Sequence, residues 1–296
     1  MSNELRLIIV SGLSGSGKTV ALHVLEDLGY NCIDNLPATL LKAAVEEVHA
    51  RDGDSTKVLA VGIDARARAD DLQSLPELLR ELGDQNIRAE IIFLHASDDI
   101  LLKRYSESRR RHPLAEIGTE LQVAIESDRK ILAEIHDCAD LVIDTSRISI
   151  YELADIIRTR VERRQSDALS VLIQSFGFKY GIPADADFVF DLRSLPNPYW
   201  TLELRGLTGL DKEVADFLNR QENFTAMFED IIGFLERWIP RYQESRRGYL
   251  TVAIGCTGGQ HRSVCMTEKL VSRLREKYDP VLIRHRSLTG RRLDPD

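Results

Sequence analysis

Short apolar runs alternate with stretches of helical periodicity along the first half of the chain. The apolar runs lie at 5–10, 30–33, 58–63, 90–94 and 141–143. Between the first two runs, apolar residues recur with the spacing of one helix face, at Val20, Val24, Leu25 and Leu28. Gly29 follows as a helix C-cap. This alternation is typical of βαβ units and predicts an α/β fold, a mostly parallel sheet with helices on both faces.

The pattern restarts after a charged stretch near Ser166. Candidate strands follow at 169–173, 187–192, 249–254 and 281–283, and helical patterns at 211–219, 223–240 and 263–277. A second, smaller α/β domain is therefore predicted. We place the two domains at 1–165 and 166–296.

Composition and charge describe an ordinary globular protein of 296 residues, with 43% hydrophobic and 29% charged side chains. There is no apolar run of ~18 residues and no basic leader, so we expect a cytoplasmic protein that does not enter a membrane. The four scattered cysteines predict reduced thiols, with neither a disulfide nor a zinc site. The formal net charge of -8 argues against indiscriminate coating of nucleic acid, although basic residues are locally in excess at 273–292.

The sequence "GLSGSGKT" between the first predicted strand and helix fits the phosphate-binding pattern G-x-x-x-x-G-K-[ST]. Backbone N–H groups of such a loop and the N-terminus of the following helix face phosphate oxygens. We expect Lys18 to reach the β- and γ-phosphates and Thr19 to help hold Mg²⁺. The predicted nucleotide loop comprises Gly12, Leu13, Ser14, Gly15, Ser16, Gly17, Lys18 and Thr19.

Three carboxylates follow predicted strands and are candidates for orienting Mg²⁺: Asp34, Asp64 and Asp144. The carboxyl ends of parallel strands open onto one crevice, so any of the three could serve. The alternative for each is a helix N-cap or a turn residue.

The basic segment "KRYSESRRRHP" at 103–113 contains Arg104, Arg109, Arg110 and Arg111. Small-molecule kinases use arginines on a lid of this kind to screen charge on a transferring phosphoryl group. We select Arg109 as the first candidate because it lies away from the start of the predicted helix. The alternative is a solvated basic helix end.

A second glycine-rich loop, "CTGGQHRS", lies between a predicted strand and a predicted helix near the C-terminus. Its loop and helix N–H groups, with charged side chains, predict an anion site for a sugar phosphate or an RNA phosphate, built from Thr257, Gly258, Gly259, His261, Arg262 and Ser263. Cys256 and Arg262 also fit C-x₅-R of cysteine-dependent phosphatases, but the sequence identifies no general acid. A loop that only permits close packing is the third interpretation.

The segment "DLRSLPNPYW" at 191–200 places Arg193 and Asn197 around two prolines, which exclude a regular helix there. We expect Tyr199 and Trp200 to belong to the core, with base stacking as the alternative.

These motifs together resemble the RapZ/YvcJ family of P-loop nucleotide-binding proteins over nearly the whole chain. The similarity is carried by "IVSGLSGSGKTVAL", "LEDLGYNCIDNLP", "RYSESRRRHPL", "LVIDTS", "SFGFKYGIPADADFVFDLRSLPNP", "TGLDKEVADFL" and "VAIGCTGGQHRSV". It implies a kinase-like N-terminal domain with ATPase and GTPase activity, ATP at Gly12–Thr19, and GTP at Asp64, Ala65, Arg66 and Ala67. It also implies a C-terminal domain that, in the enteric branch, binds RNA and senses an amino-sugar phosphate, here through Asn197 and the second loop.

The chain departs from the family pattern in two places. His95 stands where we expect an acidic residue, so a Mg²⁺ role for that strand is not expected here. The chain also ends in "TGRRLDPD" instead of a lysine-rich tail, which weakens an RNA contact through the last residues.

Three functions remain open at this point. The first is a regulatory NTPase with ligand or RNA sensing in the second domain. The second is a small-molecule kinase in which Asp34 activates an acceptor hydroxyl. The third is an RNA adaptor for ribonuclease-mediated decay of small regulatory RNA, without a required enzymatic role. The resemblance also implies a homo-oligomer.

Overall fold

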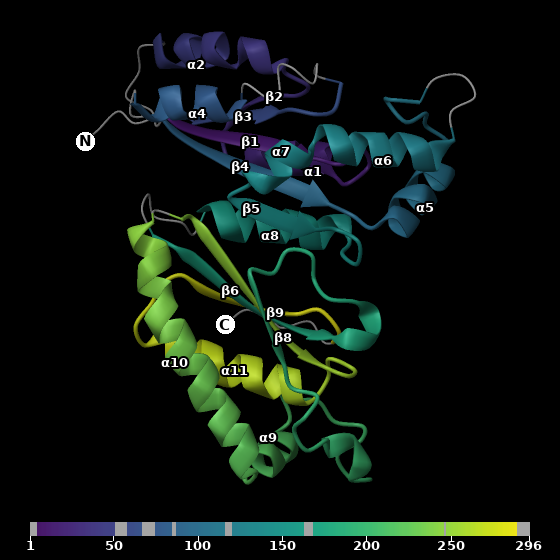
Figure 1. Ribbon diagram of the computed structural model, residues 1–296, viewed down its shortest axis with the longest axis vertical. Coiled ribbons are helices and arrows are strands. Elements are labelled where there is room, and N and C mark those ends of the chain that lie inside the picture. Colours follow the sequence, from purple (N-terminus) through teal and green to yellow (C-terminus); the bar gives the residue numbers. More distant parts are fainter. Residues whose placement is uncertain are drawn as a thin grey trace. The chain divides into compact units, whose positions relative to one another are not determined.

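The structure is a computed structural model that describes residues 5–50, 58–66, 75–84, 87–115, 120–162, 168–245 and 247–288. The predicted site residue Ala67 and the C-terminal residues 289–296 lie outside these ranges. The chain divides into two compact units, Met1–Arg163 and Arg164–Asp296, which are described separately below (Figure 1).

Unit 1 contains a five-stranded sheet in the order β2-β3-β1-β4-β5. Every strand pair is parallel, which confirms the predicted fold class. The strands are β1 (Arg6–Gly12), β2 (Asn31–Ile33), β3 (Val58–Gly62), β4 (Arg88–His95) and β5 (Leu141–Asp144). The predicted apolar runs thus became strands, with ends that differ by a few residues.

Helices cover both faces of this sheet, as the nearly continuous apolar strands require. One core joins β-strand residues such as Leu7 and Phe93 to α2, α4 and α7, and α1 packs with α8 on the other face (Figure 1). The helices of unit 1 are α1 (Lys18–Asp27), α2 (Leu41–Ala50), α4 (Leu75–Asp84), α5 (Asp98–Ser108), α6 (Leu121–Ile131), α7 (Ala133–Asp137) and α8 (Ile150–Glu162), with a 3-10 turn η1 (Ala38–Leu40).

Unit 2 is a second parallel α/β unit, with four strands in the order β7-β8-β6-β9. Its strands are β6 (Ser170–Gly177), β7 (Phe188–Asp191), β8 (Tyr249–Cys256) and β9 (Val281–His285), and its helices are α9 (Lys212–Asn219), α10 (Glu222–Glu244) and α11 (Arg262–Arg275). Short 3-10 turns lie at η2 (Phe178–Tyr180) and η3 (Pro198–Trp200). Every residue of β6 and β8 is buried, which places these strands at the centre of the core.

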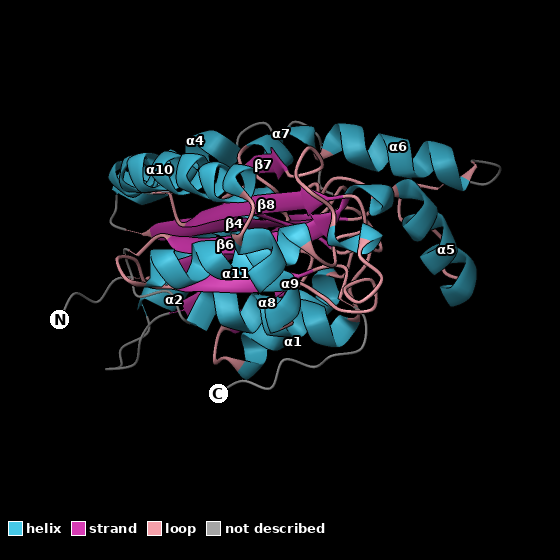
Figure 2. Ribbon diagram, turned by 90° about the horizontal axis from the view of Figure 1, so that it is seen from below, coloured by secondary structure: helices cyan, strands magenta, loops and turns pink. Residues whose placement is uncertain are grey.

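Figure 2 shows the helices in cyan and the strands in magenta. Within the described ranges, none of these helices combines the length and apolar character of a membrane span.

Candidate functional site

The predicted phosphate loop connects the end of β1 to the start of α1. Gly12 has φ 141°, and a Cβ there would lie 2.3 Å from the carbonyl oxygen of Leu94 on β4. A side chain at this position would therefore collide with the neighbouring strand. Steric exclusion thus explains why the first residue of the motif is glycine. Lys18 is the first residue of α1, so the loop backbone leads directly into a helix N-terminus.

The Lys18 ammonium group folds back over the loop. Its Nζ donates hydrogen bonds to the carbonyl oxygens of Gly12 at 2.7 Å and Leu13 at 3.3 Å. Burial lowers the pKa of Lys18, and the carboxylates of Asp128 and Asp64 oppose that shift. The Lys18 amine thus lies beside the loop with two carboxylates acting on it.

A cavity of about 600 Å³ opens at the loop. It is lined by Ser14, Gly15, Gly17, Lys18, Thr19, Val20, Asp34, Asp64, Arg66, Arg104, Tyr105, Ser108, Arg110, Arg111 and Pro113. The structure therefore gathers most of the predicted nucleotide residues around one space. Gly12, Leu13, Ser16 and Ala65 belong to the same segments but do not line it.

The three candidate carboxylates occupy different environments. Asp64 forms a bidentate pair with Arg66: its Oδ1 accepts from Nε at 3.1 Å and its Oδ2 accepts from Nη2 at 2.7 Å. Burial acts to raise the pKa of Asp64, but the hydrogen bonds from Arg66 outweigh it and leave the pKa lowered. Asp34 lines the cavity, and its carboxylate makes no hydrogen bond to another described residue.

Asp144 holds a turn instead. Its Oδ1 accepts hydrogen bonds from the backbone N–H of Ser146 at 3.0 Å and the Ser146 hydroxyl at 2.6 Å, and it is not part of the cavity lining. The Thr19 hydroxyl and the carboxylates of Asp34 and Asp64 are among the oxygen donors that line the cavity. Hard oxygen donors of this kind fit Mg²⁺.

The arginines of the basic segment lie in different surroundings. Arg104 on α5 donates to the carbonyl oxygens of Gly15 at 3.0 Å and Thr145 at 2.7 Å, so it connects the phosphate loop to the residue that follows β5. Arg110 and Arg111 line the cavity. Arg109, the predicted first candidate, is the C-cap of α5 with φ 52° and is not among the lining residues. Because α5 ends at Ser108 and Arg109 is its C-cap, the two arginines after Arg109 reach the cavity, and the sequence pattern did not show where the helix ends.

The second glycine loop lies between β8 and α11. The Cys256 Sγ accepts a hydrogen bond from the Gly259 N–H at 3.2 Å and lies 3.1 Å from the Ser263 hydroxyl. Burial acts to raise the pKa of this thiol, but the hydrogen bonds from Ser263 and Gly259 outweigh it, and the pKa is lowered. Gly259 has φ 70°, and a Cβ there would lie 2.4 Å from the Ser287 Oγ.

Arg262 is buried and bridges this loop to the segment after β7. Its guanidinium donates to the carbonyl oxygens of Arg193 at 3.0 Å and Leu195 at 2.7 Å, and to the Thr257 hydroxyl at 3.3 Å. The predicted residues Arg193, Thr257 and Arg262 are thus brought together. His261 precedes α11 and is also buried, and its burial lowers the pKa of the imidazole.

Arg193 itself is exposed on the segment after β7. It forms a bidentate pair with Asp191, donating from Nε to Oδ1 at 3.0 Å and from Nη2 to Oδ2 at 2.7 Å, and its guanidinium lies 3.9 Å from the centre of the Phe178 ring. Asn197 caps η3 by accepting a hydrogen bond from the Tyr199 N–H at 3.3 Å.

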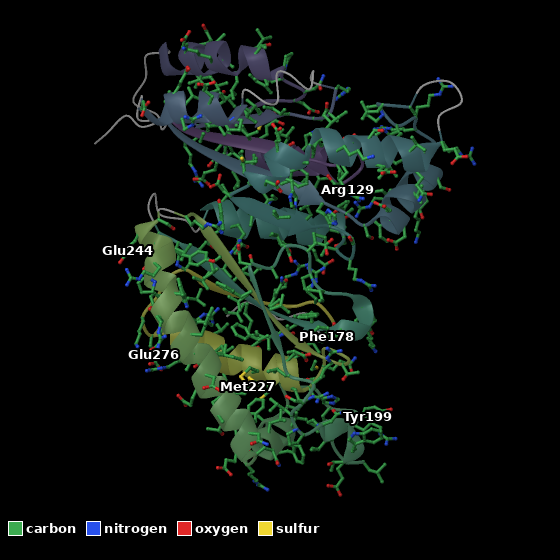
Figure 3. All side chains as sticks on the ribbon, in the orientation of Figure 1. Arg129, Phe178, Tyr199, Met227, Glu244 and Glu276 are labelled. Carbon is green, nitrogen blue, oxygen red and sulfur yellow. The ribbon has the colours of Figure 1, made fainter. Side chains whose placement is uncertain are left out.

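The expectation that Tyr199 and Trp200 belong to the core is wrong. Their exposed fractions are 44% and 76%, and Figure 3 shows Tyr199 at the periphery of unit 2. The physical reason is that Pro198 is the buried anchor of η3 and the next two residues turn outward. Arg205 covers the Tyr199 ring at 4.7 Å.

The chain is similar to known proteins over almost its full length. Family models of the RapZ-like N-terminal domain and the RapZ C-terminal domain match residues 5–165 and 169–289. A "Nucleotide-binding protein" of Halorhodospira halophila is 51% identical over 285 residues, covering 96% of this chain and 99% of that protein. One from Hahella chejuensis is 49% identical over 284 residues, covering 96% and 99%.

Several solved kinase structures align with about half of the chain. Shikimate kinase from Bacteroides thetaiotaomicron has a TM-score of 0.35 and 17% identity, over 53% of this chain and 98% of that one. Similarity this low does not indicate a function. The sequence similarity is far stronger, and the two domain models together cover both units, so the chain belongs to the RapZ family.

Proposed function

We propose that unit 1 binds a purine nucleoside triphosphate with Mg²⁺ and hydrolyses it slowly, ATP and GTP being the candidates. The observation that supports this is the composition of one cavity: a phosphate loop with Lys18 on one side, and Arg110 and Arg111 on the other. Cations thus face the same space from two segments far apart in sequence. The relatives named as nucleotide-binding proteins agree with the proposal.

Each group of residues has a distinct part in this function. The loop N–H groups and the N-terminus of α1 bind the phosphates, and Lys18 exchanges its two carbonyl partners for phosphate oxygens. The Thr19 hydroxyl and the carboxylate of Asp34 would hold Mg²⁺, which neutralises phosphate charge when bound. Arg110 and Arg111 orient the terminal phosphate. We assign GTP, as the alternative nucleotide, to the segment Asp64–Ala67.

Nucleotide binding is tested by fluorescence titration of the full chain with labelled ATP and GTP in Mg²⁺, followed by phosphate release. Lys18→Ala is expected to weaken binding at least tenfold, because it removes the cation that the buried loop offers to phosphate. Lys42→Ala is the matched control, since Lys42 is an exposed lysine on α2 that pairs with Glu81. Equal losses in both variants, or no saturable binding by the unaltered chain, would overturn the proposal.

A small-molecule kinase is the second candidate, and Asp34 favours it. This carboxylate lines the cavity and makes no side-chain hydrogen bond within the described part of the chain, as suits a base that accepts a proton from an acceptor hydroxyl. Incubation with labelled ATP and a panel of sugar alcohols would separate the two functions. A phosphorylated product that Asp34→Asn abolishes supports the kinase, whereas release of phosphate to water alone supports the NTPase.

For unit 2 we propose binding of a phosphorylated metabolite, an amino-sugar phosphate, or RNA at the second glycine loop, which would make the protein regulatory. The exposed Arg193 guanidinium and the backbone N–H groups of Thr257 and Gly258 would supply the cation and donors that such an anion needs. We also propose that its partners are a small regulatory RNA and a ribonuclease. The proposal includes self-association of the chain and a cytoplasmic location.

The anion proposal is tested by calorimetric titration of the full chain with glucosamine 6-phosphate and with a structured RNA. Arg193→Ala is the informative variant, because the exposed Arg193 side chain can be removed without opening the core. Arg205→Ala is the matched control, because Arg205 is another exposed arginine of unit 2 that lies over an aromatic ring. Binding that Arg193→Ala abolishes and Arg205→Ala preserves supports the site, and binding that neither variant changes would contradict it.

A further inference from the structure

Asp128 on α6 contacts the phosphate loop through its carboxylate. Its Oδ2 accepts a hydrogen bond from the Ser14 backbone N–H at 2.6 Å, and the Asp128 side chain is only 1% exposed. Charge-assisted hydrogen bonds to backbone N–H groups are among the stronger polar contacts in proteins. One N–H of the loop is therefore held by a carboxylate that neither the sequence motif nor the proposed function uses.

His112 shares the same carboxylate oxygen. Its Nε2 lies 3.4 Å from the Asp128 Oδ2, and both side chains are almost completely buried. The Leu114 N–H donates to the His112 Nδ1 at 3.2 Å, so that nitrogen is an acceptor and a neutral ring carries its proton on Nε2, which lies close to the Asp128 carboxylate without forming a hydrogen bond to it. The imidazole thus faces the carboxylate, and the carboxylate in turn accepts a hydrogen bond from the loop.

Two further contacts hold this pair against the loop. The Tyr105 ring lies 5.2 Å from the His112 ring and also lines the cavity beside Gly15. Arg129, labelled in Figure 3, follows Asp128 and pairs with Asp98 on α5. The Arg129–Asp98 pair connects α6 to α5 next to the buried Asp128.

The cavity-lining arginines are next to this anchor in the chain. Arg110 and Arg111 directly precede His112, and both are exposed with no ion pair to a described residue. The buried imidazole therefore fixes one end of a short arginine segment, while the helix α5 fixes the other. A shift of the Asp128 carboxylate would change the position of the loop and of these arginines together.

We propose that Asp128 is a positioning residue of the phosphate loop and that, with His112, it fixes Arg110 and Arg111 where they contact the terminal phosphate of a triphosphate. The inference rests on the proposed nucleotide function. The consequence is selectivity in binding. The Asp128–His112 pair should contribute more to the affinity for a nucleoside triphosphate than to that for the diphosphate, because only the triphosphate carries the group that the arginines contact.

The test compares the affinities of the full chain for ATP and ADP, each with Mg²⁺. Asp128→Asn keeps an acceptor for the Ser14 N–H but removes the charge, and His112→Ala removes the anchor. Both variants are expected to weaken ATP binding about tenfold and ADP binding about twofold or less, so that the ratio of the two affinities falls about fivefold. Glu126→Gln is the matched control, because Glu126 lies on α6 with an exposed side chain paired to Lys130.

His112→Gln guards against a variant that only disturbs folding, since glutamine keeps an N–H donor and should restore part of the selectivity lost in His112→Ala. Equal losses for ATP and ADP, or a ratio that stays within twofold of the unaltered chain in both variants, would overturn the inference while leaving nucleotide binding intact. Failure of the unaltered chain to bind either nucleotide would instead overturn the proposed function.

Discussion

At the scale of single residues, the contacts that matter most in unit 1 join positions far apart in the chain. The motif identified Lys18 and Thr19 because their roles are fixed by local spacing. Asp128 lies 114 residues from Ser14, and nothing in the helical pattern around it distinguishes it from a solvent-facing carboxylate. The same limit applies to Arg104, whose hydrogen bonds to Gly15 and Thr145 depend on how α5 packs beside β5.

The Cys256 thiol offers a residue-scale prediction. Its pKa is lowered in the folded chain, largely through the Ser263 hydroxyl opposing burial, so Ser263→Ala should raise that pKa. A thiol with a lowered folded pKa stabilises the fold fully above the unfolded thiol's pKa, and this stabilisation is lost as pH falls through the folded value. Alkaline pH should therefore stabilise the unaltered chain more than Ser263→Ala.

Thiolate absorbance in the ultraviolet, followed during a pH titration and referenced to Cys256→Ser, measures this shift directly. Ser272→Ala, an exposed serine on the same helix, is the matched control. A titration curve that Ser263→Ala leaves in place would show that the hydroxyl does not stabilise the thiolate.

At the scale of elements, the sequence predicted most of what the structure contains. All nine predicted strands are present, because buried parallel strands are continuous apolar runs that few other elements produce. The ends were less predictable: β6 and β8 continue to Gly177 and Cys256, where hydrogen bonding to neighbouring strands and not hydrophobicity decides the limit. The surroundings of Tyr199 and Trp200 were misjudged because aromatic character alone does not show which side chain packs inward.

Arg262 shows how one residue joins two elements, and it carries an element-scale prediction. Its guanidinium connects the start of α11 to the carbonyl groups at 193 and 195, and lysine cannot reproduce a planar donor that spans both. Arg262→Lys should therefore lower the free energy of unfolding by about 2–3 kcal/mol, since a buried carbonyl loses its charged partner.

Urea denaturation of the full chain, monitored by circular dichroism, measures this loss. Arg273→Lys is the control, because Arg273 is a partly exposed arginine on the same helix and pairs with Glu236 and Glu276. Its effect should stay within about 0.5 kcal/mol. Equal small effects in the two variants would mean that the hydrogen bonds of Arg262 to the carbonyl groups at 193 and 195 do not contribute to the free energy of unfolding.

At the scale of the whole molecule, the two units have separate hydrophobic cores. One is built around β1, β3 and β4 and the other around β6 and β8, and they share no residue. Each unit therefore has the means to unfold as a cooperative transition of its own. The proposed ligands also bind different units, so each ligand should stabilise one transition and leave the other unchanged.

Differential scanning calorimetry with saturating ATP and Mg²⁺ tests this separation. A ligand at 100 times its Kd stabilises the unit that binds it by about 2.7 kcal/mol, so one of two transitions should move to higher temperature. Lys18→Ala should abolish that shift without moving the second transition, because it changes only the loop of unit 1. A single transition that nucleotide raises as a whole would contradict independent cores, and it would imply that occupancy of the phosphate loop controls the stability of the glycine loop in unit 2.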